Sequence, residues 1–388
     1  MLKSLRGVSK MVASQIYTAL DIGESITKLV VGVVHSAKLH VCATYKTLTK
    51  GVKDGEIYSK TELQTVLTTL LDRARGEGFN VREIVLVLPS NNMNIYRKKA
   101  ENVIPQTRLI SPADIKLLKK AVCKHQIMDH EMVIGVYPIQ YMVGNDIYKN
   151  EPTGIRGNKI VLDAFLITAP IAIARGYVDL LQDMEITVVD VIIAPLANAS
   201  LLLKSQEYKK GALILDLGAQ NNSVATFYDY LFCGYKQGYL GTEKIIEDLM
   251  KNYDIDIKNA RSIYQTYGSA DLAGASNIGV LQLPGSERSI PEIEIVTLVD
   301  NVLNMILTEV KENIEFLVKD ANLPLIITGG GALIPAIAEK CEQFLGLKCH
   351  SRNFGRIGGF NPQFNAAIGG LVNYLANNSL INISLVQI

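Results

Sequence analysis

Two aspartates, Asp21 and Asp216, stand in the same local pattern: an apolar run ends on the acid, and a glycine follows two residues later. Such a bend leaves backbone N–H groups that can point at an anion beside the carboxylate. A carboxylate does not bind a phosphate directly, so each acid would act through Mg²⁺ or an ordered water. The two patterns therefore predict a site for a phosphate-bearing ligand.

Each acid lies in a predicted β-hairpin. Residues 211–227, GALILDLGAQNNSVATF, contain two β-prone runs joined by a turn with glycine and asparagine, and residues 19–34 repeat the arrangement. One such hairpin is most simply a structural element. Two of them, each opening about one half of the chain, indicate a duplication. Duplicated halves that face each other form a cleft, and clefts bind ligands.

A third feature is the run of three glycines, Gly329–Gly331, between a predicted strand and a predicted helix. Glycines let a ligand approach the backbone closely, and a helix N-terminus adds a partial positive charge. Alone, the run is equally consistent with a tight strand–helix turn. Together with the two hairpins it completes the parts needed to hold two sides of a phosphate chain and one face of a nucleoside.

Length and composition describe an ordinary globular protein. The 388 residues are 48% hydrophobic and 20% charged, which predicts two or more domains with ample core. The formal net charge of +1 gives no general attraction to nucleic acid. The five cysteines are scattered, with no metal-ligand spacing, and indicate reduced residues of a cytosolic protein.

Membrane contact has one candidate segment. The sequence has no run of 18 apolar residues and no signal peptide, which argues against a transmembrane helix and against secretion. Residues 1–15 carry apolar residues at helical spacing with lysine and arginine between them. They fit a small membrane-surface helix, a disordered leader or a structural cap.

The elements that position these features alternate between strand and helix. Residues 41–48, 84–88, 91–97, 160–168, 188–193 and 325–328 are predicted strands, and 132–143 is a predicted strand pair around Pro138. Predicted helices are 59–76, where Thr61 can cap, 112–124, 172–183, 194–203, 242–251, 256–267, 294–318 and 364–375. A loop is expected at 284–286. Residues 85–165, with strands flanking one helix, indicate a small inserted α+β subdomain.

The order of these features resembles the actin/heat-shock chaperone/sugar kinase superfamily. The finer resemblance is to the bacterial cell-division family FtsA, over about residues 17–376. It is carried by LDIGESITKLVVG, GVKDGEIYS, NEPTGIRGNKI, VIIAPLANA, ITGGGALIPAI and NPQFNAAIGG, which occur in the FtsA order. The segment 152–157 is similar to one found in the subdomain that is particular to FtsA, so it is more specific to that family than the superfamily motifs are.

The resemblance implies an α/β, actin-like, two-lobed and duplicated fold, with mixed sheets flanked by helices. The first-lobe core would comprise 1–84, 166–209 and 360–388, and the FtsA-type inserted subdomain 85–165. The second-lobe core would comprise 210–237 and 305–359, and its tip subdomain 238–304.

The resemblance also implies ATP and Mg²⁺ between the lobes. Asp21 and Asp216 would order the Mg²⁺ through water. The nucleotide would be bound by Gly23, Ser25, Thr27 and Lys28 in the first hairpin, Gly218, Asn221 and Asn222 in the second, Gly241 and Thr242 nearby, and Gly329, Gly330, Gly331 and Ala332 along the adenosine. No catalytic residue is assigned.

The partners it implies are those of a division adaptor. The chain would assemble head to tail into protofilaments and bind the C-terminal peptide of FtsZ at the second-lobe tip, roughly 240–312. It would act in the cytoplasm, at the inner face of the membrane at the division site, linking FtsZ to that membrane or to other division proteins.

The sequence departs from the family at three places. The second phosphate motif normally runs Asp-x-Gly-Gly-Gly-Thr-Thr-Asp, and here residues 216–223 read DLGAQNNS. Because alanine and glutamine adopt positive φ less readily than glycine, we expect at most slow ATP hydrolysis and weakened binding. Near residue 260 a glutamate and a lysine are replaced by Arg261 and Tyr264. Residues 378–388 contain no basic residue, so the usual C-terminal membrane helix would be replaced, lost or outside this sequence.

Two other functions share this fold. A small-molecule kinase would need a catalytic acid and a substrate pocket, and the sequence offers no clear candidate for the acid. An actin-like pilus-assembly ATPase has much of the same architecture and stays open as an alternative.

Overall fold

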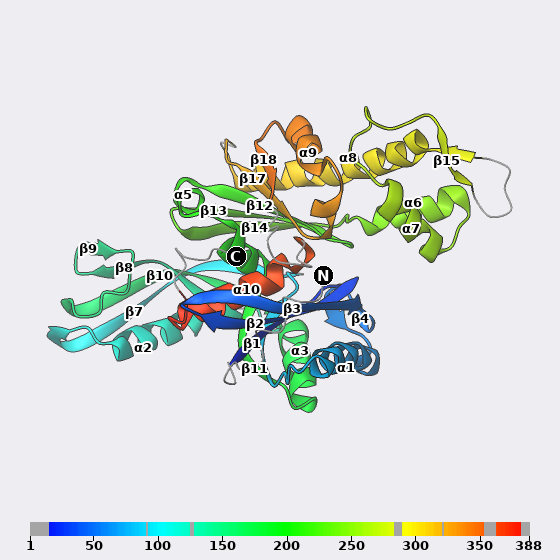
Figure 1. The fold of residues 1–388 in the computed structure, drawn as a ribbon. Coiled ribbons are helices and arrows are strands. Elements are labelled where there is room, and N and C mark those ends of the chain that lie inside the picture. The colour runs from blue at the N-terminus through cyan, green and yellow to red at the C-terminus, as the bar shows by residue number, and fades with distance from the viewer. Residues whose placement is uncertain are drawn as a thin grey trace.

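A computed structural model describes residues 15–90, 92–124, 128–282, 289–319, 322–352 and 362–381. Two five-stranded sheets form two lobes, which lie below and above one another in Figure 1, and a four-stranded sheet extends from the lower lobe. The expected membrane-surface segment 1–14 and the expected loop 284–286 lie outside the described residues.

The first lobe is defined by a mixed sheet. Its strands, in sheet order, are β11 (Thr187–Ile193), β6 (Glu83–Leu88), β1 (Ile16–Ile22), β2 (Ile26–His35) and β3 (Lys38–Leu48). The pairs β1–β2 and β2–β3 are antiparallel, and β1–β6 and β6–β11 are parallel. Successive residues of β1 point to opposite faces, so Leu20 packs in the core beneath α1 (Lys60–Gly76) and α3 (Ile171–Asp183), and Ala19 packs on the other side.

The second lobe repeats this topology. Its strands, in sheet order, are β14 (Leu231–Gly238), β13 (Asn222–Tyr228), β12 (Ala212–Leu217), β17 (Leu325–Thr328) and β18 (Cys349–Ser351). In the first hairpin Asp21 pairs with Lys28, and in the second Asp216 pairs with Ser223, so the register is the same. This equivalence confirms the predicted duplication.

Helices join and cover the two sheets. One face of the second-lobe sheet is covered by α6 (Glu243–Tyr253), α7 (Ile257–Tyr267), α8 (Glu292–Leu317) and α9 (Ile337–Leu345). Between the lobes lie α4 (Ala194–Leu202) and α10 (Asn365–Asn377), whose residues share one core with both sheets. Movement of either lobe must therefore involve α4 and α10.

The inserted sheet has a core of its own. Its strands, in order, are β7 (Asn94–Leu109), β10 (Arg156–Pro170), β8 (Glu131–Val143) and β9 (Asp146–Tyr148), and α2 (Pro112–Cys123) packs on it. The predicted strand pair around Pro138 is wrong, because β8 is one strand whose register shifts opposite Ala164, the partner of Pro138. The predicted strand 91–97 continues to Leu109. We retain 85–165 as the proposed bounds of this subdomain, although β10 continues to Pro170.

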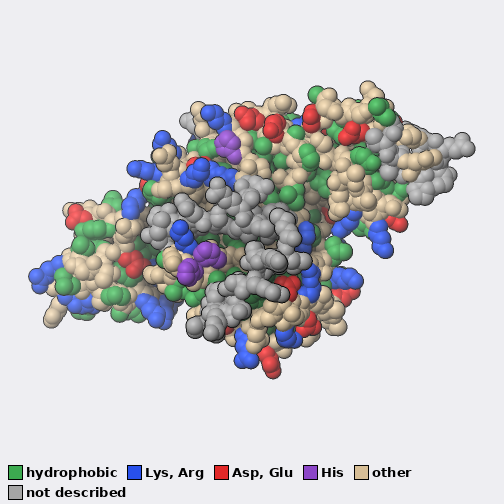
Figure 2. All heavy atoms as spheres, in the orientation of Figure 1, with side chains coloured by type: hydrophobic (Ala, Val, Ile, Leu, Met, Phe, Trp, Pro, Cys, Tyr) green, Lys and Arg blue, Asp and Glu red, His purple; other side chains and the backbone are tan. Residues whose placement is uncertain are grey.

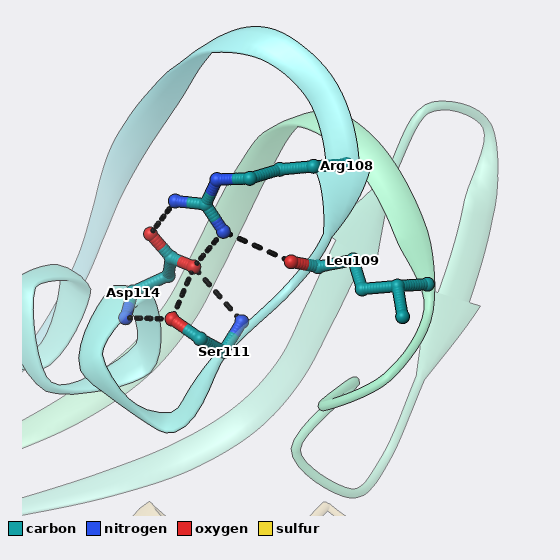
Figure 3. Close-up of polar contacts among 4 residues, drawn as sticks. All are labelled: Arg108, Leu109, Ser111 and Asp114. Carbon is teal, nitrogen blue, oxygen red and sulfur yellow. Dashed lines mark hydrogen bonds and ion pairs between the residues drawn. The ribbon is translucent and has the colours of Figure 1, made fainter.

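The start of α2 follows from a short polar motif (Figure 3). The Ser111 hydroxyl accepts from the Asp114 N–H at 3.3 Å, and the Asp114 carboxylate accepts from the Ser111 N–H at 2.8 Å. This is a capping box, with Pro112 at the first helical position. Arg108 donates to both carboxylate oxygens, at 2.7 and 2.9 Å. The hydrogen bonds from Arg108 and Ser111 hold the pKa of Asp114 well below its usual range.

The remaining elements are short. They are β4 (Val52–Lys53), β5 (Glu56–Ile57), α5 (Ser205–Lys210), β15 (Gly279–Gln282), β16 (Ser289–Pro291) and two 3₁₀ turns, η2 (Gly330–Leu333) and η3 (Pro362–Phe364). Two local expectations are corrected. Ser59, not Thr61, caps α1, since its side chain accepts from Glu62 N–H. The glycine run continues into η2, and α9 begins only at Ile337 after the left-handed Ala336, so the glycines do not open an α-helix.

The surface carries charges of both signs. Figure 2 shows acidic and basic side chains interspersed on this face, in keeping with the near-neutral net charge. Among the described helices, none combines the length and apolar character needed to cross a bilayer.

Candidate functional site

A cleft of about 560 Å³ lies between the two lobes. Its walls come from the turns of both hairpins, the end of β17, the starts of α4 and α6, α7 and the residues before α10. The volume is in the range typical of small-molecule sites. Asp21 and Asp216 both line it, as the duplicated hairpins predict for two facing halves.

Asp21 is held by an ion pair within its own hairpin. It is 8% exposed, and its Oδ2 lies 2.7 Å from Nζ of Lys28, its register partner on β2. Both side chains of the pair are largely buried. Because charges buried in this way interact more strongly than exposed ones, the pair fixes the position of both groups at the cleft wall.

Asp216 is in a different environment. Its Oδ2 accepts a hydrogen bond of 3.1 Å from Nδ2 of Asn198 on α4. The pKa of Asp216 is raised to about 6: burial is the largest cause and the charge of Asp21 acts in the same direction, while Lys28 and the bond from Asn198 partly offset them. The charges of Asp21 and Lys28 in the first hairpin therefore act on the Asp216 carboxyl in the second.

The residues predicted to bind nucleotide divide into two groups. Those that line the cleft are Gly23, Ser25, Lys28, Gly218, Asn221, Thr242, Gly329 and Gly330. Those that do not are Thr27, Asn222, Gly241, Gly331 and Ala332. The residues of the second group lie behind the wall of the cleft, and their contact with a nucleotide stays a prediction.

Two of the supporting residues are fully buried in polar contacts. The Thr27 hydroxyl lies 2.8 Å from that of Thr49, which itself donates to Gly23 O at 2.6 Å. Nδ2 of Asn222 donates to Leu240 O at 3.0 Å and to Glu309 Oε2 at 2.9 Å. Both side chains hold the two hairpin turns from behind.

The other supporting residues are small because backbone or side chains fill the space beside them. A Cβ on Gly241 would overlap Ala219 O, and one on Gly331 would overlap Leu217. Gly329 has φ +83°, and a Cβ there would overlap Oδ1 of Asp216. These close approaches bring the glycine run and the start of α6 against the turn that follows Asp216.

The second phosphate turn is closed by the start of α6. Thr242 N–H donates to Gly218 O at 3.0 Å, and Glu243 N–H donates to Ala219 O at 2.7 Å. The Glu309 carboxylate accepts from the N–H groups of Tyr239 and Leu240 and so anchors the preceding loop to α8. The turn is therefore held in place without the two glycines that the family motif has and this chain lacks.

Among the polar residues of the cleft that sequence reasoning missed, Glu243 and Asn198 make the most informative contacts. Glu243 accepts from Arg261 at 2.7 Å and from the Ser25 hydroxyl at 3.4 Å. Asn198 reaches the cleft from a helix whose other residues are almost all apolar. The signal for each was present, since Glu243 follows directly after Gly241-Thr242 and Asn198 is the one amide in its helix. The departures Arg261 and Tyr264 both line the cleft.

The cleft has nearly balanced charges. Acids in its lining are Asp21, Glu24, Asp216 and Glu243, and cations are Lys28, Lys46 and Arg261. Among the described residues, no group of three or more His, Cys, Asp or Glu could hold a metal ion alone. The oxygen donors present suit Mg²⁺, which uses one or two carboxylates together with phosphates and water.

Comparison with known sequences gives one consistent relationship. No family model matches the chain. It is 26% identical over 360 residues to the cell division protein FtsA of Streptococcus pneumoniae, covering 90% of this chain and 78% of that protein. It is 22% identical to FtsA of Bacillus subtilis, covering 95% and 85%. Over most of its length, the chain is similar to the cell division protein FtsA.

Solved structures show the fold of the protein. A type IV pilus biogenesis complex, PilM–PilN, matches with a TM-score of 0.67 at 17% identity, covering 92% of this chain and 97% of that one. MreB5 of Spiroplasma citri bound to ADP matches with a TM-score of 0.54 at 13% identity, covering 94% and 97%. These likenesses confirm the actin-like fold expected from the sequence.

Proposed function

We propose that this protein binds ATP with Mg²⁺ in the interlobe cleft. The observation that carries the proposal is the convergence of Asp21 and Asp216, from two hairpins of identical register, on one cavity. MreB5 has been solved with ADP and with AMPPNP, which supports a nucleotide in this fold. Both nucleotide complexes are of MreB5, and nucleotide binding by the present chain is our proposal.

The donor set of the cleft fits Mg²⁺. When bound, the cation would supply the positive charge that the four lining acids and a polyphosphate together require. Asp21 and Asp216 would hold waters of its hydration shell, and Lys28 would offer its ammonium group to the phosphates. The glycines at 329 and 330 would admit the nucleoside close to the backbone.

The proposed activity is at most slow hydrolysis. Ala219 and Gln220 occupy the positions where the family motif has glycines, and the Ala219 carbonyl accepts from Glu243 N–H at the start of α6. The turn that follows Asp216 is thus held by α6, so we expect that its backbone cannot move closer to the phosphates. Catalytic residues remain unassigned.

We further propose that the chain is an adaptor of division that assembles head to tail and binds the FtsZ C-terminal peptide at the second-lobe tip. The relatives named above are cell division proteins. The tip, which carries α6, α7 and β15, exposes large apolar side chains, including Leu272 and Ile278, at 40% and 74%. The proposed place of action is the cytoplasmic face of the membrane at the division site.

Calorimetry with ATP and Mg²⁺ tests the nucleotide site. We expect saturable binding that is weakened at least tenfold by Lys28→Ala, because that change removes a cation from the cleft wall. Lys53→Ala, which removes an exposed lysine of β4, is the matched control. Absence of binding by the unaltered chain, or equal binding by both variants, contradicts the proposal.

The adaptor role is tested separately. We expect a peptide with the C-terminal sequence of FtsZ to retain the chain in a pull-down, and Ile278→Asp to abolish retention. Electron microscopy on a lipid monolayer tests for filaments with and without ATP. Failure to retain the chain would favour the pilus-assembly ATPase as its function over the division adaptor.

A further inference from the structure

Asn198 has one satisfied and one unsatisfied polar atom at the cleft. The residue is 1% exposed, and Nδ2 donates to Asp216 Oδ2 at 3.1 Å. Oδ1 has no hydrogen-bond partner in the described part of the protein. A buried amide oxygen without a partner costs free energy, so such atoms are normally bonded to protein, water or ligand. Because Asn198 lines the cleft, a molecule bound in the cleft could supply the missing partner.

The packing of α4 keeps Asn198 in this position. Gly369 of α10 lies against the carbonyl oxygen of Ala197, so closely that a Cβ on Gly369 would overlap it. The neighbours Ala197 and Ala199 are fully buried. The asparagine is therefore enclosed by packed helices except on the side that lines the cleft, and its bond to Asp216 holds the amide there.

A second buried asparagine provides a comparison. Nδ2 of Asn365 on α10 donates to the Thr328 hydroxyl at 2.8 Å, and its Oδ1 also has no partner in the described residues. Thr328 is the Cα partner of Asp216 in the parallel β12–β17 pair. The two helices between the lobes, α4 and α10, thus each donate one amide hydrogen bond to adjacent strand ends of the second lobe. Only Asn198 of the two lines the cleft.

We propose that Asn198 is a positioning residue for the cation of the cleft: Nδ2 holds the Asp216 carboxylate, and Oδ1 accepts a hydrogen bond from a water of the cation's hydration shell. The inference rests on the proposed function. Mg²⁺ gives up its waters reluctantly and usually keeps several of them when bound. Partners that orient such a shell typically change metal affinity by about 10- to 100-fold when removed.

The test compares ATP binding in Mg²⁺ with ATP binding in EDTA, by calorimetry on the full chain. Asn198→Leu replaces the amide by an apolar group of similar shape. We expect the gain in ATP affinity that Mg²⁺ gives to fall by about 10- to 100-fold, while affinity in EDTA stays the same. A residue that only supported the fold would change both affinities together.

A double variant locates the effect. In Asp216→Asn we expect the gain in ATP affinity that Mg²⁺ gives to fall. Adding Asn198→Leu should cause little further loss, because both residues act on the same water shell.

Asn365→Leu is the matched control, since it removes an equally buried asparagine that does not line the cleft. It should leave the Mg²⁺-dependent gain unchanged. Thermal melting of each variant confirms folding, and Asn198→Ala substitutes if Asn198→Leu does not fold.

The outcomes separate the two proposals. No ATP binding by the unaltered chain in either buffer overturns the nucleotide site and this inference together. Mg²⁺-dependent binding that Asn198→Leu and Asn198→Ala leave unchanged, or weaken equally in both buffers, overturns only the role of Asn198.

Discussion

The hydroxyl of Ser25 and the carboxylate of Glu243 lie 3.4 Å apart, one from each side of the cleft. Ser25 belongs to the first hairpin turn and Glu243 to the first turn of α6 in the second lobe. Glu243 is also paired with Arg261 at 2.7 Å. A phosphate that approached Ser25 would meet a negative charge already placed at that hydroxyl, and Arg261 would be neutralised by it.

Replacing Glu243 by glutamine should therefore strengthen ATP binding. The change removes a like charge close to the phosphates and frees Arg261 to face them. We expect an increase in affinity of roughly 3- to 10-fold, equivalent to about 1 kcal/mol, measured by calorimetry at low salt. Glu247→Gln removes the same charge from an exposed position on the same helix and should change little. Weaker binding by Glu243→Gln would show that the carboxylate contacts the nucleotide favourably.

Asp216 is expected to destabilise the ligand-free fold at neutral pH. Its folded-state pKa of about 6 lies above the ordinary value of 3.8 because burial disfavours the charged form. The native state therefore binds more protons between these values, so the carboxyl costs nothing well below pH 4, and its penalty grows as the pH rises and is complete above pH 6. From the size of the shift, the full penalty is about 1 to 3 kcal/mol.

Asp216→Asn should accordingly raise the melting temperature at pH 8 in EDTA, and raise it less at pH 4.5. Asparagine keeps an oxygen that can accept from Asn198, so the packing is retained. Asp179→Asn, at an exposed position of α3, provides the control for a change of net charge. A gain of the same size at both pH values would assign the effect to packing instead of ionisation.

The sequence allowed the architecture to be predicted because its signals were local and repeated. The two acid-glycine hairpins have one register, and the Ser-Pro start of α2 was recognisable from four residues. Both depend on neighbouring residues alone. The resemblance to FtsA supplied the order of the lobes, and the sheets then followed the expected duplication.

What could not be predicted depended on distant parts of the chain. Asn222 is directed away from the cleft by Glu309, which lies 87 residues further along the chain. Ser59 and Thr61 are equally good caps by type, and the choice between them is made by where the chain leaves Gly51, whose carbonyl bonds Ser59 N–H. The left-handed Ala336 separates the glycine run from α9, which no local preference of alanine indicates.

The contact between α4 and α10 makes a prediction about Gly369. Gly369→Ala would force its new methyl group into the Ala197 carbonyl and push the helices apart, so we expect a loss of about 1 to 3 kcal/mol in the free energy of unfolding. Gly76→Ala is the paired control: nothing lies within 4 Å of its Cβ position, and alanine favours the helix by about 0.5 to 1 kcal/mol. Chemical denaturation measures both. Equal effects would mean that the close crossing does not form in solution.

The capping box of α2 predicts local rather than global destabilisation. Ser111→Ala removes the hydroxyl that accepts from Asp114 N–H and that donates to the Asp114 carboxylate at 2.6 Å (Figure 3). We expect a loss of about 1 kcal/mol, seen as faster hydrogen exchange across Pro112–Cys123, because α2 packs within the separate core of the inserted sheet. The helix of the second lobe, Ile257–Tyr267, should keep its exchange rate.

Ser262→Ala, in the middle of that second-lobe helix, controls for loss of a hydroxyl that does not cap a helix.

Arg108→Ala should act in the same direction as Ser111→Ala. It removes the two guanidinium hydrogen bonds to Asp114, which are the largest cause of the low pKa of that carboxyl. Because the folded-state pKa of Asp114 is depressed, the stabilisation it gives is present at neutral pH and is lost as the pH falls toward that pKa. The difference between Arg108→Ala and the unaltered chain should therefore shrink on acidification. A difference that is independent of pH would assign the contribution of Arg108 to its packing on the end of β7.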